Sequence, residues 1–252
     1  MNLEDNINNE NLFDKLNEIT KNISGKLNIL NEQIDIDTQI EYFEYSKNIK
    51  EKNNDVSINI NDKKENLFDQ ETPIEEKKEI IVILASDDNV KSYRTLEKYS
   101  KNPDKELKDW SILALQESKM IIEGSILNEN QIFISTGLGG KNSKLRYFTV
   151  LFAKNDNGFT DTQKQIISKE LIFSLKHHNA EIEKIEFYKK FSKIASLIPI
   201  QEPIRNIFKE AINNCNELGH FINENFLITN TKILNNDEIS AFLKNKKKSI
   251  KK

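Results

Sequence analysis

Apolar side chains recur at intervals of three and four near the start of the chain. The positions are Leu12, Leu16, Ile19, Ile23, Leu27 and Leu30. This period predicts one apolar stripe along a helix over residues 11–31. A stripe this narrow suits a coiled coil, a helix that docks on its own chain, or a helix that folds on a partner. Together with a second helix predicted over residues 38–50, it defines an acidic, amphipathic helical segment over residues 1–50.

Residues 51–71 are mostly polar, and we interpret them as a linker with little to bury. Helical periodicity then returns. Thr72-Pro73-Ile74-Glu75 has the pattern of a capping box with proline at the first helical position. Two further helices are predicted, the first capped by Asp87 or Asp88 and the second running from Pro103 to Glu123. Short turns between these three helices predict a helical layer over residues 72–124.

One segment of this layer is similar to a known repeat. Residues 102–117 read Asn-Pro-Asp-Lys-Glu-Leu-Lys-Asp-Trp-Ser-Ile-Leu-Ala-Leu-Gln-Glu. The segment resembles the second helix of a HEAT-type repeat, with Asp104, Leu107, Lys108, Ala114 and Leu115 at the matching positions. The resemblance spans one helical pair, residues 87–123, and the sequence holds no second copy to stack on it. It implies a helical hairpin and assigns no function.

From Gln131 the apolar period changes from 3.6 to 2, which is typical of strands. The predicted elements are strands at 131–136 and 145–152 joined as a hairpin, a helix at 160–178, a long or bent strand at 181–200, a helix at 204–218, a strand at 226–234 and a helix at 237–243. Their order, ββαβαβ, predicts a small, mainly antiparallel sheet with helices on one face. We therefore expect an α+β protein whose α+β domain covers residues 125–243.

Charge is distributed unevenly along the 252 residues. Residues 1–79 carry 19 acidic and 10 basic side chains, and residues 80–252 carry 21 acidic and 27 basic ones. Six lysines lie within residues 244–252 alone, so the preceding body is close to neutral and does not have the charge of a basic nucleic-acid surface. We interpret residues 244–252 as a solvated, lysine-rich tail that attracts polyanions by charge.

The single cysteine, Cys215, excludes an internal disulfide and favours a reducing compartment. The first residues are acidic where a signal peptide needs positive charge, and no segment approaches the roughly 18 apolar residues of a membrane span. We expect a cytoplasmic protein without membrane contact.

Glycine is rare, yet three of the seven glycines lie in Thr136–Lys141. The loop matches neither the nucleotide P-loop nor the dinucleotide-binding pattern. We interpret it as the tip of a hairpin with glycine at positive φ. Nearby cations also allow an anion-binding nest or a protein-docking loop. The candidate ligand-binding residues are Gly137, Gly139, Gly140, Lys141, Lys144 and Arg146.

No residues form a convincing catalytic set. His177 and His178 end a predicted helix, where adjacent side chains diverge by about 100°, so they suit capping better than sharing a metal ion. Cys215 lies on the apolar stripe of its helix and is predicted to belong to the core. We predict no cofactor and no metal site, and catalysis is unsupported.

Three functions follow from these patterns. The first is a non-enzymatic interaction module or adaptor that binds a protein through the N-terminal helix or the glycine loop. The second is an anion-binding or phosphorylated-ligand domain, including an enzyme, that uses the loop residues 137–141. The third is a nucleic-acid-binding or ribosome-associated protein that makes weak contacts through the lysine-rich tail.

Overall fold

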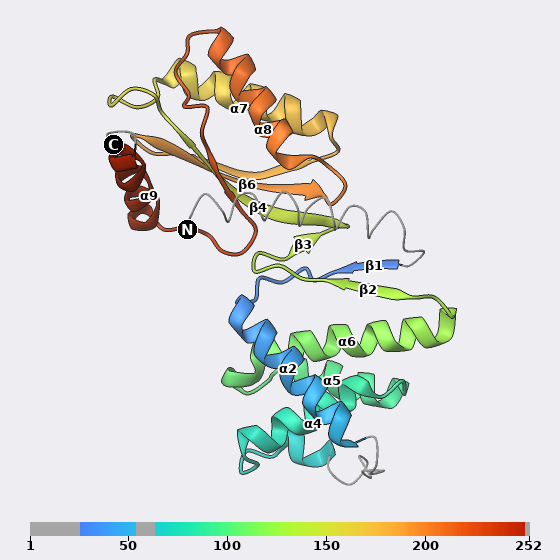
Figure 1. Ribbon diagram of the computed structural model, residues 1–252. Coiled ribbons are helices and arrows are strands. Elements are labelled where there is room, and N and C mark those ends of the chain that lie inside the picture. Colours follow the sequence, from blue (N-terminus) through green and yellow to red (C-terminus); the bar gives the residue numbers. More distant parts are fainter. Residues whose placement is uncertain (1–25, 54–63, 250–252) are drawn as a thin grey trace. The chain divides into compact units, whose positions relative to one another are not determined.

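The computed structural model describes residues 26–53 and 64–249 (Figure 1). The chain divides into two compact units, Met1–Ser135 and Thr136–Lys252. The first unit is mainly helical, and the second contains a curled antiparallel sheet, so the predicted α+β class is confirmed.

The first unit consists of a helical layer with a short parallel strand pair along one side of it (Figure 1). Its elements are β1 (Lys26–Ile29), α2 (Ile36–Asn53), the 3₁₀ turn η1 (Lys64–Phe68), α4 (Ile74–Ser86), α5 (Val90–Ser100), the 3₁₀ turn η2 (Lys105–Leu107), α6 (Lys108–Leu127) and β2 (Gln131–Ile134). The hairpin implied by the HEAT resemblance corresponds to α5 and α6, which pack on each other and on α4.

Aromatic packing fixes α2 on this helical layer. The ring of Tyr42, fully buried, meets the ring of Trp110 edge to face, with centroids 5.2 Å apart. Leu67 of η1 is also fully buried in the same core. The interpretation of residues 51–71 as a linker is therefore wrong at its C-terminal end, where Leu67 is buried and the ring of Phe68 lies 6.0 Å from that of Tyr99. The alternating residues 56–60 lie outside the described part of the chain.

Helix boundaries in this unit differ from the predicted ones at three places. Helix α4 begins at Ile74 without a side-chain cap, so Thr72 does not complete the predicted capping box. The side chain of Asn89, and not that of an aspartate, accepts from the backbone N–H of Lys91 at the start of α5. Helix α6 continues through Gly124 to Leu127, since Asn128 supplies the left-handed residue, with φ at 51°, that ends it.

The two strands of the first unit connect segments that lie far apart in sequence. Residues Lys26–Ile29 pair in parallel with Gln131–Ile134. The prediction of a helix over residues 11–31 is therefore wrong for Lys26–Ile29, and its residues 11–25 lie outside the described part of the chain. The predicted hairpin between 131–136 and 145–152 is also wrong. Alternation of apolar residues identifies a strand but does not identify its partner, and a parallel partner can come from anywhere in the chain.

The second unit is a four-stranded antiparallel sheet with an added ribbon. Its elements are β3 (Gly140–Lys141), β4 (Lys144–Phe152), α7 (Asp161–His177), β5 (Glu181–Phe187), β6 (Phe191–Pro199), α8 (Ile204–Glu217), β7 (Leu227–Thr229) and α9 (Asn236–Ser249). The strand order is β7-β4-β6-β5, and β3 pairs with the start of β4. From β4 to β7 the elements run βαββαβ, which is the split, ferredoxin-like arrangement.

The predicted single strand over residues 181–200 is a hairpin of β5 and β6. The chain turns at residues 188–190, where the backbone N–H of Tyr188 donates to the carbonyl of Phe191 at 2.8 Å. The apolar alternation changes phase near Lys189, and this change marks the turn. After the turn the chain continues as β6, which pairs with β5.

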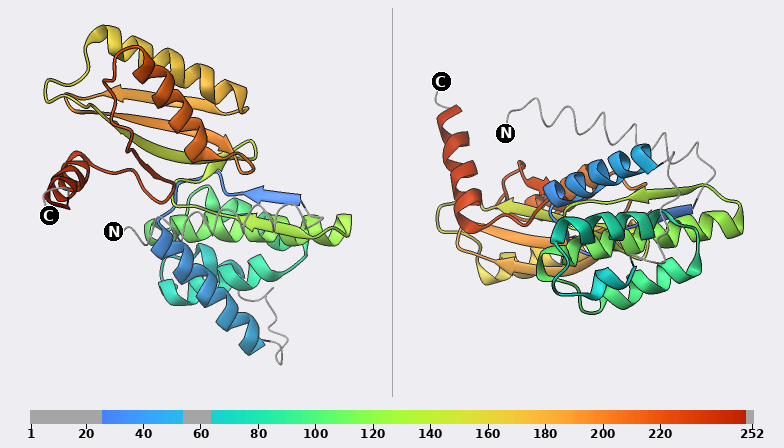
Figure 2. Two further views of the ribbon diagram at one scale, coloured as in Figure 1. Left: turned by 45° about the horizontal axis from the view of Figure 1, so that its top comes forward. Right: turned by 90° about the horizontal axis from the view of Figure 1, so that it is seen from below.

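The sheet is covered on both faces. Residues directly opposite each other on paired strands share a face. Leu145, Tyr147, Thr149 and Leu151 of β4 lie on the face covered by α7 and α8. The other face carries Phe148, Val150 and Phe152 of β4 with Phe191 and Lys193 of β6, and it packs against Ile239 of α9. We call this second surface, together with Tyr188 beside it, the α9 face. Helices α7 and α8 lie together on one side of the sheet and α9 on the other (Figures 1 and 2).

Candidate functional site

Helix α9 begins at a reciprocal cap. The side-chain oxygen of Asn235 accepts from the backbone N–H groups of Asp237 and Glu238, both at 2.9 Å. The carboxylate of Glu238 accepts in return from the backbone N–H of Asn235 at 2.8 Å. This arrangement satisfies the first amides of the helix as a capping box does. The Asn-x-x-Glu spacing was readable in the sequence, but the prediction placed the helix start at Asp237 and did not use it.

One apolar stripe anchors α9 to the sheet. Ile239 is fully buried, and Phe242 and Leu243 are half-buried against the same cluster. The ring of Phe242 lies nearly parallel to that of Phe152, with centroids 6.1 Å apart and an angle of 14° between the planes. The helix then continues to Ser249, so it includes Lys244 and Lys246–Lys248. Most of the predicted solvated tail over residues 244–252 is therefore part of a helix attached to the sheet.

The α9 face gathers four aromatic rings around one lysine. Tyr188 and Phe191 stack with centroids 5.0 Å apart, and Phe152 lies directly opposite Phe191 in the ladder. The Lys193 Nζ atom lies 5.2 Å from the Tyr188 ring and 6.0 Å from the Phe148 ring, both within the range of cation–π attraction. No sequence motif identified this cluster, because its members come from separate strands.

The glycine loop is packed inward and is not an exposed tip. Gly137, Gly139 and Gly140 are buried, and the exposed turn of the β3–β4 ribbon is Lys141–Ser143. The backbone N–H of Leu138 donates to the carbonyl of Asn230 at 3.0 Å, and that of Gly139 donates to the carbonyl of Thr136 at 3.0 Å. The interpretation of these glycines as a hairpin apex is therefore wrong. The amides of residues 138 and 139 already have protein acceptors.

The cations beside this loop bind carboxylates of β5. Arg146 contacts Glu183 with two donors, at 2.6 and 2.9 Å, and donates a third bond to the carbonyl of Leu138 at 2.7 Å. Lys144 bonds Glu181 at 2.5 Å, and this hydrogen bond lowers the pKa of the Glu181 carboxyl. Lys141 is exposed. The six predicted residues do lie together, but two of the three cations have anionic partners, which does not favour a bound anion. The ligand-binding role stays a prediction.

The histidines and the cysteine have structural contacts. The His177 ring hydrogen-bonds the carbonyl of Phe173 at 2.9 Å, and the His178 ring pairs with Glu202 at 2.5 Å. Cys215 is buried on the sheet-facing side of α8, and burial raises the pKa of its thiol to about 12. Within residues 26–53 and 64–249, no three His, Cys, Asp or Glu side chains converge as metal ligands do. None of the helices described there has the length and hydropathy of a membrane span.

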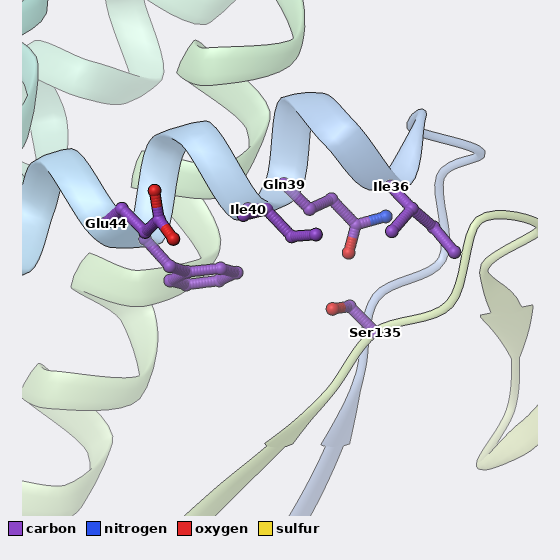
Figure 3. Close-up of a pocket in the computed structure, with 6 residues that line it drawn as sticks. Ile36, Gln39, Ile40, Glu44 and Ser135 are labelled. Atoms are coloured by element: carbon purple, nitrogen blue, oxygen red, sulfur yellow. The ribbon is translucent and has the colours of Figure 1, made fainter.

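The first unit carries a shallow apolar pocket of about 350 Å³ beside the N-terminal half of α2. Its lining residues are Ile36, Gln39, Ile40, Phe43, Glu44 and Ser135 (Figure 3). The Gln39 side chain donates to the carbonyl of Ile34 at 2.8 Å, so this polar group of the pocket lining already has a protein partner. The pocket holds no cluster of chemically reactive side chains.

Comparisons with known proteins find likeness in structure alone. No protein-family model and no curated protein matches the chain. A candidate transposase from Deinococcus radiodurans is 13% identical and covers 40% of this chain and 90% of its own, with a TM-score of 0.35. The REP-associated tyrosine transposase bound to a REP hairpin is 16% identical and covers 38% of this chain and 61% of its own, with a TM-score of 0.28.

These comparisons correct the first functional hypothesis. Both solved structures are described as transposases and neither as an adaptor, so the interpretation as a non-enzymatic interaction module is abandoned. At these scores the likeness concerns part of the fold, and the function of this chain has to be argued from its own residues.

Proposed function

We propose that this protein binds nucleic acid through α9, with the lysines in the second half of the helix contacting the phosphate backbone. The observation that carries the proposal is the continuity of α9: its first half is fixed to the sheet by Ile239 and Phe242, and the same helix runs on into the lysine-rich segment. We also propose a cytoplasmic location, which the single cysteine favours.

Helical geometry separates the anchoring positions from most of the lysine positions. Positions 239, 242 and 243 are related as i, i+3 and i+4 and form one stripe, which position 246 extends. Positions 244, 247 and 248 are related in the same way and lie about 140° further around the helix, at 100° per residue. A helix docked through the first stripe therefore offers the second group of positions to a partner.

An anchored helix binds a polyanion at lower entropic cost than a free tail. A disordered segment loses conformational freedom when it binds, and this loss reduces its affinity. Residues up to Ser249 are already helical, so three lysine positions are held at fixed spacing along one side. The near-neutral body of the protein makes α9 the main source of positive charge for such contacts.

The proposal predicts a defined salt dependence. Each phosphate contact with duplex DNA contributes about 0.9 to the slope of log affinity against log salt, and each contact with a single strand contributes about 0.7. Replacing Lys244, Lys247 and Lys248 by glutamine should therefore reduce the slope by about 2 to 3. Glutamine and lysine have similar helix propensities, so α9 is expected to remain helical.

The test uses fluorescence anisotropy of labelled 20-base single strands and 20-base-pair duplexes, titrated with the full-length protein between about 50 and 300 mM salt. The matched control replaces three exposed lysines of α7 and α8, Lys169, Lys176 and Lys209, by glutamine. We expect the α9 variant to lose at least tenfold in affinity at low salt and the control to stay within about twofold of the parent. Equal losses in both variants, or no binding by the parent protein, would overturn the proposal.

A further inference from the structure

We propose that the α9 face of the sheet is a second binding site, which takes the bases of single-stranded nucleic acid, and that α9 covers it in the state described here. The inference rests on the proposed function, because it assumes that nucleic acid is the ligand. The inference adds that the ligand is an unpaired strand. It also names the surface by which the protein would distinguish such a strand from a duplex.

The aromatic side chains of the sheet are sorted by face. Of the four aromatic residues of β4 and β6, Phe148, Phe152 and Phe191 lie on the α9 face, and only Tyr147 lies under α7 and α8. The covered partner face is built from aliphatic residues with small hydroxyl groups such as Thr149 and Ser196. These rings pack against Ile239, Phe242 and Leu243 of α9 and against Leu138 and Leu234, so α9 and two leucines outside it cover them in the state described here.

The spacing of the rings suits separate bases. Successive residues on one face of a strand lie about 6.6 Å apart, at roughly 3.3 Å rise per residue. Bases of a single strand stack individually on such rings, and proteins use four-stranded sheets with exposed aromatic residues for this purpose. The nearly parallel ring of Phe242, stacked on Phe152, occupies the position that a base would take.

A lysine in the middle of the cluster provides the charge. Lys193 is only partly exposed, and its Nζ atom donates to the carbonyl of Leu234 at 3.2 Å. Leu234 belongs to the segment that leads into α9. If α9 and this segment move away from the sheet, the ammonium group loses that acceptor while it stays among the rings, where a phosphate can replace the carbonyl.

The cover consists of α9 and two leucines outside it. Of the α9 side chains in the cluster, Ile239 is fully buried, whereas Phe242 and Leu243 stay partly exposed, and Leu138 and Leu234 pack against the same rings. A strand whose bases occupy this surface therefore has to displace the three α9 side chains and the segment that carries Leu234. The lysine positions on the released helix remain tethered next to the bound strand.

The test compares single strands with duplexes in a variant whose cover is loosened. Ile239→Gln with Phe242→Gln removes the anchor without changing the charge and leaves every lysine in place. The probes are a fluorescein-labelled 12-base oligothymidylate and a 12-base-pair duplex at one salt concentration. We expect at least a tenfold gain in affinity for the single strand and no gain for the duplex. The matched control is Phe173→Gln, which changes an exposed ring on α7 and should alter neither affinity.

A second pair of changes tests the surface itself. Adding Tyr188→Ala to the loosened variant should remove about fivefold or more of the gained affinity, since a stacked base contributes on this scale. Lys193→Gln in the otherwise unchanged protein keeps α9 docked, so it remains informative if the loosened variant fails to fold. It should weaken single-strand binding more than duplex binding.

The outcomes separate this inference from the proposed function. Hydrogen exchange over residues 236–249 reports whether α9 is released, and exchange over β4 and β6 reports whether the sheet is intact. If α9 is released and single-strand affinity does not rise, or if Lys193→Gln affects both probes equally, the base-binding site is refuted. The lysine variants of α9 decide the proposed function independently of that result.

Discussion

Replacing Gly137 by alanine is expected to destabilise the second unit by direct contact with backbone. A β-carbon at this position would lie 1.7 Å from the carbonyl oxygen of Thr231 and 2.6 Å from its carbonyl carbon. Both atoms belong to the main chain, so no side-chain rotation relieves the contact. The φ angle of Gly137 is not positive, and the need for glycine therefore comes from close approach alone.

The size of the effect follows from the bonds that must be strained. An unstrained carbon–oxygen contact is about 3.3 Å, so the two segments would have to separate by roughly 1.6 Å. That shift breaks the Leu138 N–H bond to Asn230 and disturbs the Arg146 bond to the carbonyl of Leu138. A neutral bond contributes about 0.5 to 1.5 kcal/mol and one to a charged group about 1.5 to 3 kcal/mol, which gives a loss of about 2 to 4 kcal/mol.

Gly124→Ala is the matched control for this substitution. Its added β-carbon would lie 3.3 Å from the flexible side chain of Gln131, and the residue is inside helix α6, where alanine is favoured over glycine by about 1 kcal/mol. Urea unfolding and hydrogen exchange with mass spectrometry over β4 and β6 measure the effect of Gly137→Ala, and the fluorescence of Trp110 follows Gly124→Ala in the first unit. If Gly137→Ala unfolds at the same urea concentration as the parent, the described packing of the glycine loop is refuted.

Three further predictions concern other parts of the fold. Asp104→Asn should destabilise the first unit by about 3 kcal/mol, because it leaves the buried Lys77 without its partner at 2.8 Å. Burial raises the pKa of Asp104, but hydrogen bonds from Lys77 and Tyr99 outweigh burial and lower this pKa below the ordinary 3.8. The ionised carboxylate therefore stabilises the fold above about pH 4. Urea titrations should show that the difference in unfolding free energy between parent and variant shrinks as the pH falls below 3.8. The thiol of Cys215 should react with a disulfide reagent only as fast as the protein unfolds, and rapid native-state labelling would contradict its burial. Thr160→Ala should cost about 1 kcal/mol in urea unfolding because it removes the cap of α7, and an unchanged midpoint would speak against that cap.

Local sequence signals predicted local structure well. The capping box at Thr160 and Gln163 is present with both of its hydrogen bonds, and the apolar stripe from Ile204 to Cys215 forms the buried side of α8. In both cases the interacting residues are three or four positions apart, so the pattern and the contact lie in the same short segment. The turn at Lys189 left a similar local trace, which was interpreted as a bend because both halves read as strand.

Long-range pairing left no comparable signal. The pairing of Lys26–Ile29 with Gln131–Ile134 joins segments about a hundred residues apart, and nothing in either segment names the other. The role of Gly137 is of the same kind, because the atom that requires glycine there belongs to Thr231. The scarcity of glycine pointed to an important loop. The glycines are required there because the loop packs tightly within the second unit, whereas the sequence interpretation placed them at an exposed tip.

The candidate site was missed for a related reason, although the sequence of β4 contains part of it. From Tyr147 to Phe152 this strand is apolar at every position except Thr149, and a strand of that kind must be covered on both faces. The predicted fold supplied helices for one face only, so a second cover was required and α9 is the element that provides it. Helix α9 contributes only Ile239, Phe242 and Leu243 to the cluster and ends in lysines, so it combines a narrow apolar stripe with positive charge. Those two properties are the reason for proposing a polyanionic ligand at this face. The sequence alone did not reveal them, because it is the pairing of β4 with β6 that places Phe152 and Phe191 opposite each other on the face that α9 covers.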